Sequence, residues 1–505
     1  MRNIVFGIVN KIVMLAFPFI IRTLIIYYIG IQYAGLNNLF VSILQVLNLS
    51  ELGFSSAIVY SMYKPVAEND IKKIGTLLNY FKKIYLIIGL IILGIGIMIM
   101  PLIPYLIKDS YPSDVNLYIL YLLFLVNTCI SYFFGGYKSS VLNAYQRTDI
   151  ISNISSFSLG GMYILQICVL ICVRDYYVYI LMMPVFTLIN NFIVAICVNK
   201  LYPSIKPFGI LDRETKDDIR KHVSGIMINR LCETSRNSLD SIFISAFLGL
   251  EMNAIYSNYY CIISSIFALL DIIGNSMLAG IGNSIQTESV EQNYNDLKRF
   301  NFIYMWIGGL GASCLICLYQ PFMELWMGKD KMLPLEIVIL FAVYFYVKLM
   351  GNMSSLYFIG NGLWWEGKKK SYIETGMNLL FNFILVQIWG ITGIILATLV
   401  PLISVNLIYG QGFVFKYYFN NMRKTEFFLL EMKYLIYTVL LCAIIFYVCQ
   451  VYVNDSFSLM ETVAVRFVVC IVLFNILYWI LCRKSEEYTD ARKWILKKCD
   501  KKGRQ

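Results

Sequence analysis

The chain has 505 residues, of which 59% are hydrophobic and only 14% are charged. Soluble globular proteins carry about 25% charged residues, so this composition excludes an ordinary soluble domain and indicates a membrane protein. The formal net charge of +11 would fit a nucleic-acid partner, but the positions of the charges along the chain give a different explanation.

Fourteen apolar segments follow one another, each near the roughly 20 residues that a helix needs to cross a bilayer. We therefore expect an all-α polytopic membrane protein with about 14 transmembrane helices. Segments of alternating polarity, which a transmembrane barrel needs, are rare. The approximate limits of the spans are 4–29, 36–62, 83–107, 115–137, 150–173, 177–199, 222–248, 254–283, 301–322, 334–360, 371–389, 392–415, 433–453 and 461–482.

The first span is too long for the apolar core of a signal peptide and contains Lys11 and Arg22, so we expect it to be retained. With both termini in the cytoplasm, most Lys and Arg residues fall on the cytoplasmic side. The external loops then hold only Lys108, Arg174, Lys329 and Lys331. This distribution follows the positive-inside rule and explains the net charge without nucleic acid.

The order of the spans predicts five regions. They are an N-terminal six-helix bundle (1–199), a cytoplasmic linker (200–221), a second six-helix bundle (222–415), two additional transmembrane helices (416–482) and a basic cytoplasmic tail (483–505). The tail is expected to lie near anionic lipid head groups.

Spans 1–2 and 7–8 resemble each other. The segments "YIGIQYAGLNNLF" and "FLGLEMNAIYSNYY" begin their common motif at Gly30 and Gly249, and the same offset places Lys11 on Arg230. The two copies are six spans apart, an even number, so the halves would have the same orientation. Parallel repeats of this kind are frequent in transporters, with the substrate site between the halves.

Charges inside a span are costly, at least ~2.5–3.5 kcal/mol each at mid-bilayer, so they normally face protein or water. Helical spacing places Lys11 and Arg22 on one face of span 1, with Pro18 between them. In span 7 the segment "NRLCETSRNSLD" places Arg230, Glu233, Arg236 and Asp240 in one arc, at spacings that allow ion pairs.

Other spans add polar side chains at positions that could line a cavity. These are Asn38, Gln45, Asn48 and Glu51 in span 2, Asp271 and Asn275 in span 8, and Lys348 in span 10. One interpretation is that the acids Glu51, Glu233, Asp240 and Asp271 balance the cations or couple transport to an ion. The other is that the charges pair with one another and only hold the bundle together.

Span 1 offers Arg22 no acid. Its partner is therefore expected on another helix, with Glu51 as a candidate, or in water, or on an anionic substrate. A guanidinium suits phosphate because its planar fork of donors matches the oxygens.

The sequence offers little for catalysis or metal binding. It has 13 cysteines, scattered singly and mostly in apolar runs, and one histidine, His222, so we expect small apolar fillers and no zinc site. The segment "GLWWEGKK" (362–369) lacks the hydroxyl residue of a phosphate-binding loop. We predict a transporter with no cofactor, and the coupling ion, H⁺ or Na⁺, stays open.

The chain resembles bacterial polysaccharide flippases of the multidrug/oligosaccharidyl-lipid/polysaccharide exporter superfamily. The resemblance is carried by residues 20–75, with Arg22, the "YIGIQYAGLNNLF" turn and the basic loop after "MYKP". It implies a MATE-like fold in the bacterial cytoplasmic membrane that flips undecaprenyl-diphosphate-linked oligosaccharide to the outer leaflet. It also implies cavity cations (Arg22, Arg230 and Arg236, with Lys11 and Lys348) and other polysaccharide-assembly membrane proteins as partners.

Two alternatives stay open at this point. A multidrug cation antiporter of the same fold would favour an unpaired acid and few arginines; Glu51, Glu233 and Asp271 keep it in view, whereas Lys11 and Arg22 argue against it. A membrane polysaccharide polymerase or acyltransferase would need a large external loop or an embedded histidine, and neither is evident.

Overall fold

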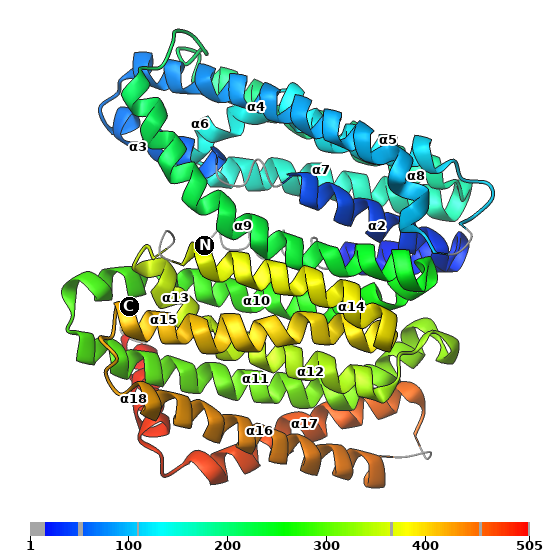
Figure 1. Ribbon diagram of the computed structural model, residues 1–505, viewed down its shortest axis with the longest axis vertical. Helices are drawn as coiled ribbons and strands as arrows, with labels where there is room; N and C mark the ends of the chain where they lie inside the picture. The colour runs from blue at the N-terminus through cyan, green and yellow to red at the C-terminus, as the bar shows by residue number, and fades with distance from the viewer. Residues whose placement is uncertain (1–15, 49–53, 109–110, 364–366, 454–456, 503–505) are drawn as a thin grey trace. The chain divides into compact units, whose positions relative to one another are not determined.

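A computed structural model describes residues 16–48, 54–108, 111–363, 367–453 and 457–502. Every regular element within these ranges is a helix (Figure 1). Nine of the described helices are long and apolar enough to cross a membrane, or ten if the bent pair Leu117–Phe133 and Gly136–Ala144 is one span. The all-α polytopic architecture is confirmed. The count of 14 is not, although each predicted span has a helical counterpart among the described residues.

The chain divides by its internal contacts into two compact units, Met1–Ala254 and Ile255–Gln505. In the first unit α2 packs on α9, α5 and α7 both pack on α8, and α4 packs on α5. Its elements are the helix Ala16–Tyr28, α2 (Ile31–Leu47), α3 (Phe54–Ala67), α4 (Ile71–Ile99), η2 (Met100–Leu106), α5 (Leu117–Phe133), η3 (Gly136–Lys138), α6 (Ser139–Ala144), α7 (Thr148–Cys168), η4 (Val169–Val173), α8 (Tyr176–Leu201) and α9 (Arg213–Leu248).

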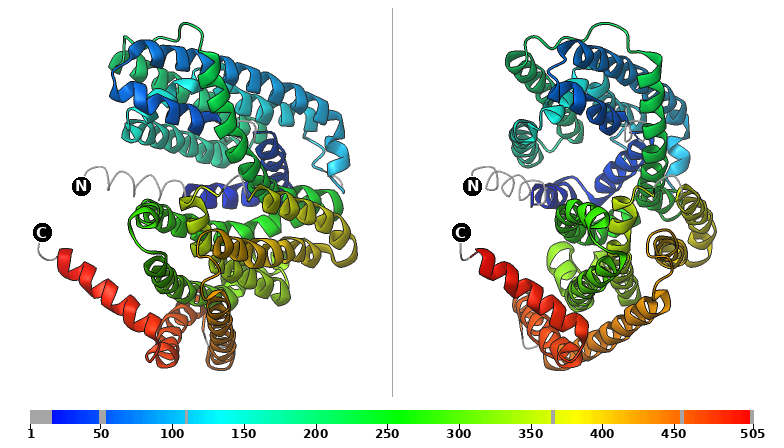
Figure 2. Two further views of the ribbon diagram at one scale, coloured as in Figure 1. Left: turned by 60° about the vertical axis from the view of Figure 1, so that its left-hand side comes forward. Right: turned by 90° about the vertical axis from the view of Figure 1, so that its left-hand side faces the viewer.

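In the second unit α11 is the central helix, with α12, α16, α17 and the C-terminal α18 packed against it (Figure 2). The elements are α10 (Leu250–Thr287, whose first residues belong to the first unit), α11 (Val290–Met327), η5 (Lys329–Lys331), α12 (Leu335–Met350), α13 (Asn352–Gly360), α14 (Lys368–Pro401), η6 (Leu402–Tyr409), α15 (Gly410–Tyr417), α16 (Lys424–Tyr452), α17 (Leu459–Cys482) and α18 (Glu486–Lys502).

The predicted division at residues 200–221 stays a prediction. In the structure, α9 follows this linker but packs on α2 and α3, so most of its contacts are with the first unit. The prediction concerns which helices form one copy of the repeat, and these contacts do not test that. The predicted break between 371–389 and 392–415 coincides with Gly390, whose φ of +55° interrupts α14.

Many helices begin where the sequence supplies an oxygen for their first free N–H groups. Asp70 accepts from the Lys73 N–H, Asp175 from Val178 and Asp212 from Thr215, each at 2.8–2.9 Å. At α17 the Ser458 hydroxyl accepts from the Glu461 N–H while the Glu461 carboxylate accepts from the Ser458 N–H, a reciprocal capping box.

The two copies of the predicted repeat share a turn made by one glycine. Gly30 has φ +139° and Gly249 has φ +93°, values that suit a residue without Cβ. The Gly30 N–H donates to the Ile25 carbonyl at 2.9 Å, and the Gly249 N–H donates to the Ile244 carbonyl at 3.0 Å. Both bonds reach back five residues, so the two turns are closed by the same hydrogen bond, which supports the repeat.

Candidate functional site

A cavity of about 220 Å³ with a mixed lining, more apolar than polar, lies within the first unit. Its walls come from the helix Ala16–Tyr28 and from α2, α7 and α8, and they combine one cation with amides, aromatic rings and apolar side chains. The lining residues are Pro18, Ile21, Arg22, Ile25, Ala34, Asn37, Asn38, Met162, Tyr163, Gln166, Tyr179 and Met183.

Arg22 supplies the only charged side chain among these lining residues, and it is half-buried. It lies four residues after Pro18, and the next residue, Thr23, donates its hydroxyl to the Phe19 carbonyl at 2.8 Å. The Thr23 hydroxyl is thus bonded within its own helix, and Arg22 is the polar residue that this helix contributes to the cavity lining.

The neighbouring amides on α2 have hydrogen-bonding capacity left over. Asn37 Oδ1 and Asn38 Nδ2 are buried and have no hydrogen-bond partner among the described residues. A buried amide atom without a partner costs about 1–3 kcal/mol, so a ligand or an ordered water is expected there. One atom is an acceptor and the other a donor, which suits a hydroxylated ligand.

The opposite wall is held in place by α7 and α8. Gln166 is 1% exposed and donates its Nε2 to the Tyr179 carbonyl at 3.3 Å. Tyr163 stacks on Phe17, with ring centroids 5.4 Å apart. An aromatic and amide wall facing a guanidinium can recognise an anionic group with sugar or polyol character. Drug-sized pockets span about 300–1,000 Å³, so this cavity would hold a small ligand or part of a larger one.

Other predicted residues of the first unit have protein partners. Gln45 is exposed, and its Oε1 accepts from the Ser238 hydroxyl of α9 at 3.1 Å. Asn48 accepts from the Tyr132 hydroxyl of α5. Asp240 is 5% exposed within α9. Of the predicted residues whose side chains the structure describes, Arg22 and Asn38 line the cavity and the others do not.

The second unit contains three predicted residues on α10 and α12. The Lys348 ammonium lies 4.0 Å from the centroid of the Phe267 ring, a cation–π contact. Asp271 follows Phe267 by one helical turn and is exposed, as is Asn275 one turn later. They form a short polar stripe on α10 next to the Lys348 contact.

Five predicted residues cannot be placed. Lys11 and Glu51 lie outside the described residues. Arg230, Glu233 and Arg236 belong to α9, but their side chains are outside the described part of the structure.

Sequence reasoning missed the cavity residues Asn37, Tyr163, Gln166 and Tyr179.

It also missed a row of buried polar residues on α14. Glu374 is 6% exposed and accepts from the Asn406 amide at 3.3 Å. One turn on, fully buried Asn378 donates to the Ala397 carbonyl and to the Thr398 hydroxyl, both at 3.2 Å. The spacing of four between Lys370, Glu374, Asn378 and Asn382 is the signal that would have revealed this row.

A second buried carboxyl lies on α16. Glu431 is 1% exposed, and its Oε1 accepts from the Gln411 amide at 2.8 Å. Both buried acids lie outside the spans in which the sequence suggested interior acids: Glu374 is in the predicted span 371–389, and Glu431 lies just before the predicted span 433–453.

Comparison with known proteins gives a fold but no sequence family. No family model matches the chain, and no curated protein matches it. Among solved structures, the lipid II flippase MurJ in an inward closed conformation is similar with a TM-score of 0.68 at 17% identity, over 95% of this chain and 99% of that chain.

Two further structures extend the similarity. An inward-facing multidrug resistance MATE transporter of the MOP superfamily has a TM-score of 0.60 at 16% identity, over 82% of this chain and 98% of that one. A MOP superfamily transporter from Pyrococcus furiosus, described by the reverse polarity of its binding pocket, has a TM-score of 0.52 at 16% identity, covering 82% and 95%. The chain has the fold shared by MurJ and MATE transporters, which confirms the MATE-like architecture.

Proposed function

We propose that the protein is a flippase that moves undecaprenyl-diphosphate-linked oligosaccharide from the inner to the outer leaflet, for cell-surface polysaccharide export. The observation that carries this proposal is Arg22, which lines a cavity of a MurJ-like fold beside Asn37 and Asn38, whose buried amide atoms have no hydrogen-bond partner among the described residues. The membrane would be the bacterial cytoplasmic membrane, with both termini in the cytoplasm.

The proposed mechanism addresses the cost of desolvating a diphosphate. A charged group cannot enter hydrocarbon unaided, because the loss of hydration is prohibitive. A cationic cavity that opens alternately to either side lets the head group cross while the protein walls move. Arg22 would form a forked pair with a phosphate, and Asn37 and Asn38 would bind neighbouring oxygens.

Further charges extend this proposal beyond the described cavity. Lys11, Arg230, Arg236 and Lys348 would provide additional cationic contacts along the path of the head group. Glu51, Glu233, Asp240 and Asp271 would balance these cations when no substrate is bound, or bind a coupling cation. The lipid tail would stay in the bilayer throughout, so the cavity needs to accept only the head group.

Flipping of lipid-linked oligosaccharide in proteoliposomes tests the proposal. Arg22→Ala is expected to lower the initial rate about 10- to 100-fold, because a charge-assisted hydrogen bond contributes about 1.5–3 kcal/mol. Arg22→Lys should recover part of it, since a point charge replaces the fork. The matched control is Arg147→Ala, which removes an exposed arginine paired with Asp149 at 3.0 Å. Transport by Arg22→Ala at the parental rate would disprove the proposal.

A second candidate function is antiport of organic cations. It is favoured by the similarity to a MATE transporter and by the exposed acid Asp271. The same vesicles, loaded with a fluorescent organic cation, separate the two functions. Cation transport that survives Arg22→Ala but is lost in Asp271→Asn, together with no flipping, would establish the antiporter.

A further inference from the structure

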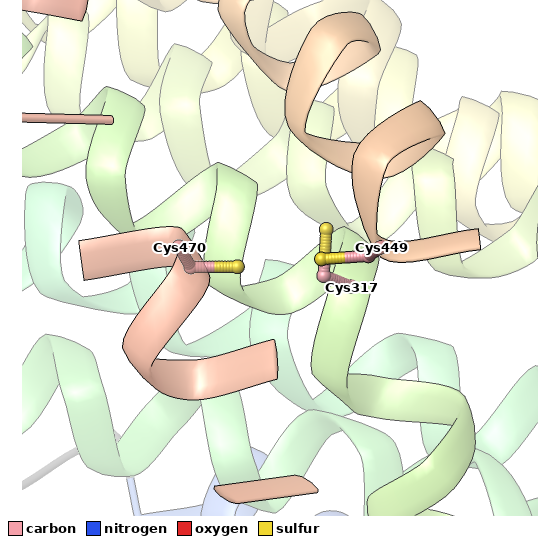
Figure 3. Close-up of side chains that lie close together, drawn as sticks. All are labelled: Cys317, Cys449 and Cys470. Carbon is pink, nitrogen blue, oxygen red and sulfur yellow. The ribbon is translucent and has the colours of Figure 1, made fainter. Parts of the chain in front are cut away.

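Three cysteines converge inside the second unit. Cys317 of α11, Cys449 of α16 and Cys470 of α17 are 1%, 0% and 0% exposed, and their sulfur atoms all lie within 4.8 Å of one another. Figure 3 shows the side chains pointing toward a common point from three different helices. Packing explains a single buried cysteine, because a thiol behaves as a small apolar group. It does not explain why three sulfurs meet.

The spacing of the sulfurs suits a shared metal ion. Zinc binds thiolate sulfur at about 2.3 Å in tetrahedral sites, which places ligand sulfurs roughly 3.8 Å apart. Sulfurs already within 4.8 Å reach that spacing by changes of about 1 Å or less. Each ligand comes from a different helix, so small rotations of side chains are enough.

A buried cation lies beside the cluster. Arg466 is 9% exposed, and it donates Nη1 to the Cys317 carbonyl at 3.3 Å and Nη2 to the Val453 carbonyl at 3.2 Å. It precedes Cys470 by one turn of α17, and Val453 follows Cys449 by one turn. The guanidinium Nε is buried and has no hydrogen-bond partner among the described residues.

This arginine fixes the charge that the site can hold. Three thiolates carry three negative charges, and a divalent ion together with one guanidinium carries three positive charges. The assembly is then neutral, which matters because unbalanced charge in a dry interior is costly. A monovalent ion would leave one negative charge.

A backbone oxygen lies beside the cluster. Ser313 lies one turn before Cys317 on α11 and is fully buried. Its carbonyl accepts from the Cys470 thiol at 3.9 Å. The described residues thus supply three sulfur ligands, with one backbone carbonyl in contact with Cys470.

We propose that Cys317, Cys449 and Cys470 bind a thiophilic divalent metal ion, with zinc as the probe, and that this ion fastens α16 and α17 to α11. Each thiol loses its proton to solvent on binding, and no electron transfer is involved. Because the site is buried, the ion enters before the three helices pack. The inference is independent of the transported substrate.

Zinc X-ray absorption on the full-length protein, produced in zinc-supplemented cells, tests the site. About one zinc per chain is expected, with a sulfur shell near 2.3 Å. The triple variant Cys317→Ser, Cys449→Ser, Cys470→Ser should retain less than about a tenth of this zinc. The matched control, Cys168→Ser with Cys172→Ser, removes two exposed cysteines of the first unit and should retain it.

Several outcomes would overturn the proposal. They are a zinc shell of nitrogen and oxygen only, zinc content unchanged in the triple variant, and a Cys317–Cys449 disulfide found by mass spectrometry without reductant. If the triple variant does not fold, the absorption spectrum of the parent decides, together with the single variant Cys470→Ala, which should lose one sulfur from the shell.

Discussion

The first unit contains two similar helix hairpins. The first consists of the helix Ala16–Tyr28 and α2, and the second consists of the end of α9 and the start of α10. Both turn at a single glycine, but the side chains between their two helices differ. The offset that aligns Gly30 with Gly249 aligns Arg22 with Ser241 and Ala34 with Asn253. In the first hairpin, Arg22 and Ala34 line the cavity. In the second, the Ser241 hydroxyl donates to Asn253 Oδ1 at 2.6 Å.

Asn253 closes the second hairpin further. Its Nδ2 donates to the Ser245 hydroxyl at 2.7 Å and to the Gly35 carbonyl of α2 at 3.3 Å. The same backbone turn thus accompanies a cavity lined by one cation in the first hairpin and a cluster of side-chain hydrogen bonds in the second. The difference comes from two aligned positions. The first hairpin has Arg22 and Ala34 there, and the second has Ser241 and Asn253. The candidate site therefore lies where the side chains of the first hairpin differ from those at the aligned positions of the second.

The largest effect is expected where the two hairpins touch. A Cβ on Gly35 would lie 2.2 Å from the Leu250 carbonyl oxygen, so Gly35→Ala forces backbone to move. Overpacking costs about 1–3 kcal/mol, and a clash with backbone belongs at the upper end. Thermal unfolding in detergent should show a clear fall in Tm. The control is Gly94→Ala, where an added Cβ meets nothing within 4 Å; an equal fall there would refute the steric explanation.

Arg22→Ser gives the first hairpin the residue of the second. We expect roughly a 10- to 100-fold loss of flipping, because the charged donor is lost, with Tm close to that of the parent. Proteoliposome rates and thermal unfolding on the same preparation check both parts. A loss of transport accompanied by unfolding would show that Arg22 acts as scaffold.

Asn253→Ala should have the opposite pattern. It leaves the Ser241 and Ser245 hydroxyls and the Gly35 carbonyl without this partner, so stability should fall by about 1–2 kcal/mol. Transport per folded molecule should stay near the parental rate. Asn253→Asp keeps the acceptor but places a carboxylate oxygen against the Gly35 carbonyl in a fully buried position, so it should lose at least as much stability as Asn253→Ala. A smaller loss in Asn253→Asp would indicate that the bond from Ser241 alone stabilises this position.

The smallest effect is expected for Ala34→Asn, which copies the second hairpin into the cavity wall. Ala34 is 3% exposed and faces the cavity, so the larger amide narrows it. We expect flipping to fall about threefold, or roughly 0.6 kcal/mol. A concentration series with the lipid-linked substrate should show weaker binding, with the maximal rate little changed. An unchanged affinity would place the substrate elsewhere.

The sequence was sufficient for the fold class because long apolar runs with one-sided loop charges have few other solutions. It also revealed the glycine turns, whose backbone requirement is local. The cavity was only partly predictable. Arg22 and Asn38 stood out as polar residues in apolar spans, but helical phase does not say which helix faces which. Tyr163 and Gln166 come from α7, and neither the sequence of α7 nor that of the first helix indicates that the two line one cavity.

The cysteines illustrate the same limit more strongly. Cys317, Cys449 and Cys470 lie far apart in the sequence, so spacing suggested isolated apolar fillers. Only the packing of α16 and α17 on α11 brings them together. The hydrogen bonds of Arg466 to two carbonyls depend on that same packing.

The single-glycine turns also bear on how the chain enters the membrane during synthesis. At Gly30 and Gly249 the turn amide is bonded to the preceding helix, so only the turn at the glycine joins the two helices of each hairpin and no loop separates them. We expect a pair joined this closely to enter the bilayer together. Arg22 would then enter the bilayer packed against α2, together with the neighbouring amides of Asn37 and Asn38, and not on a single unpaired helix.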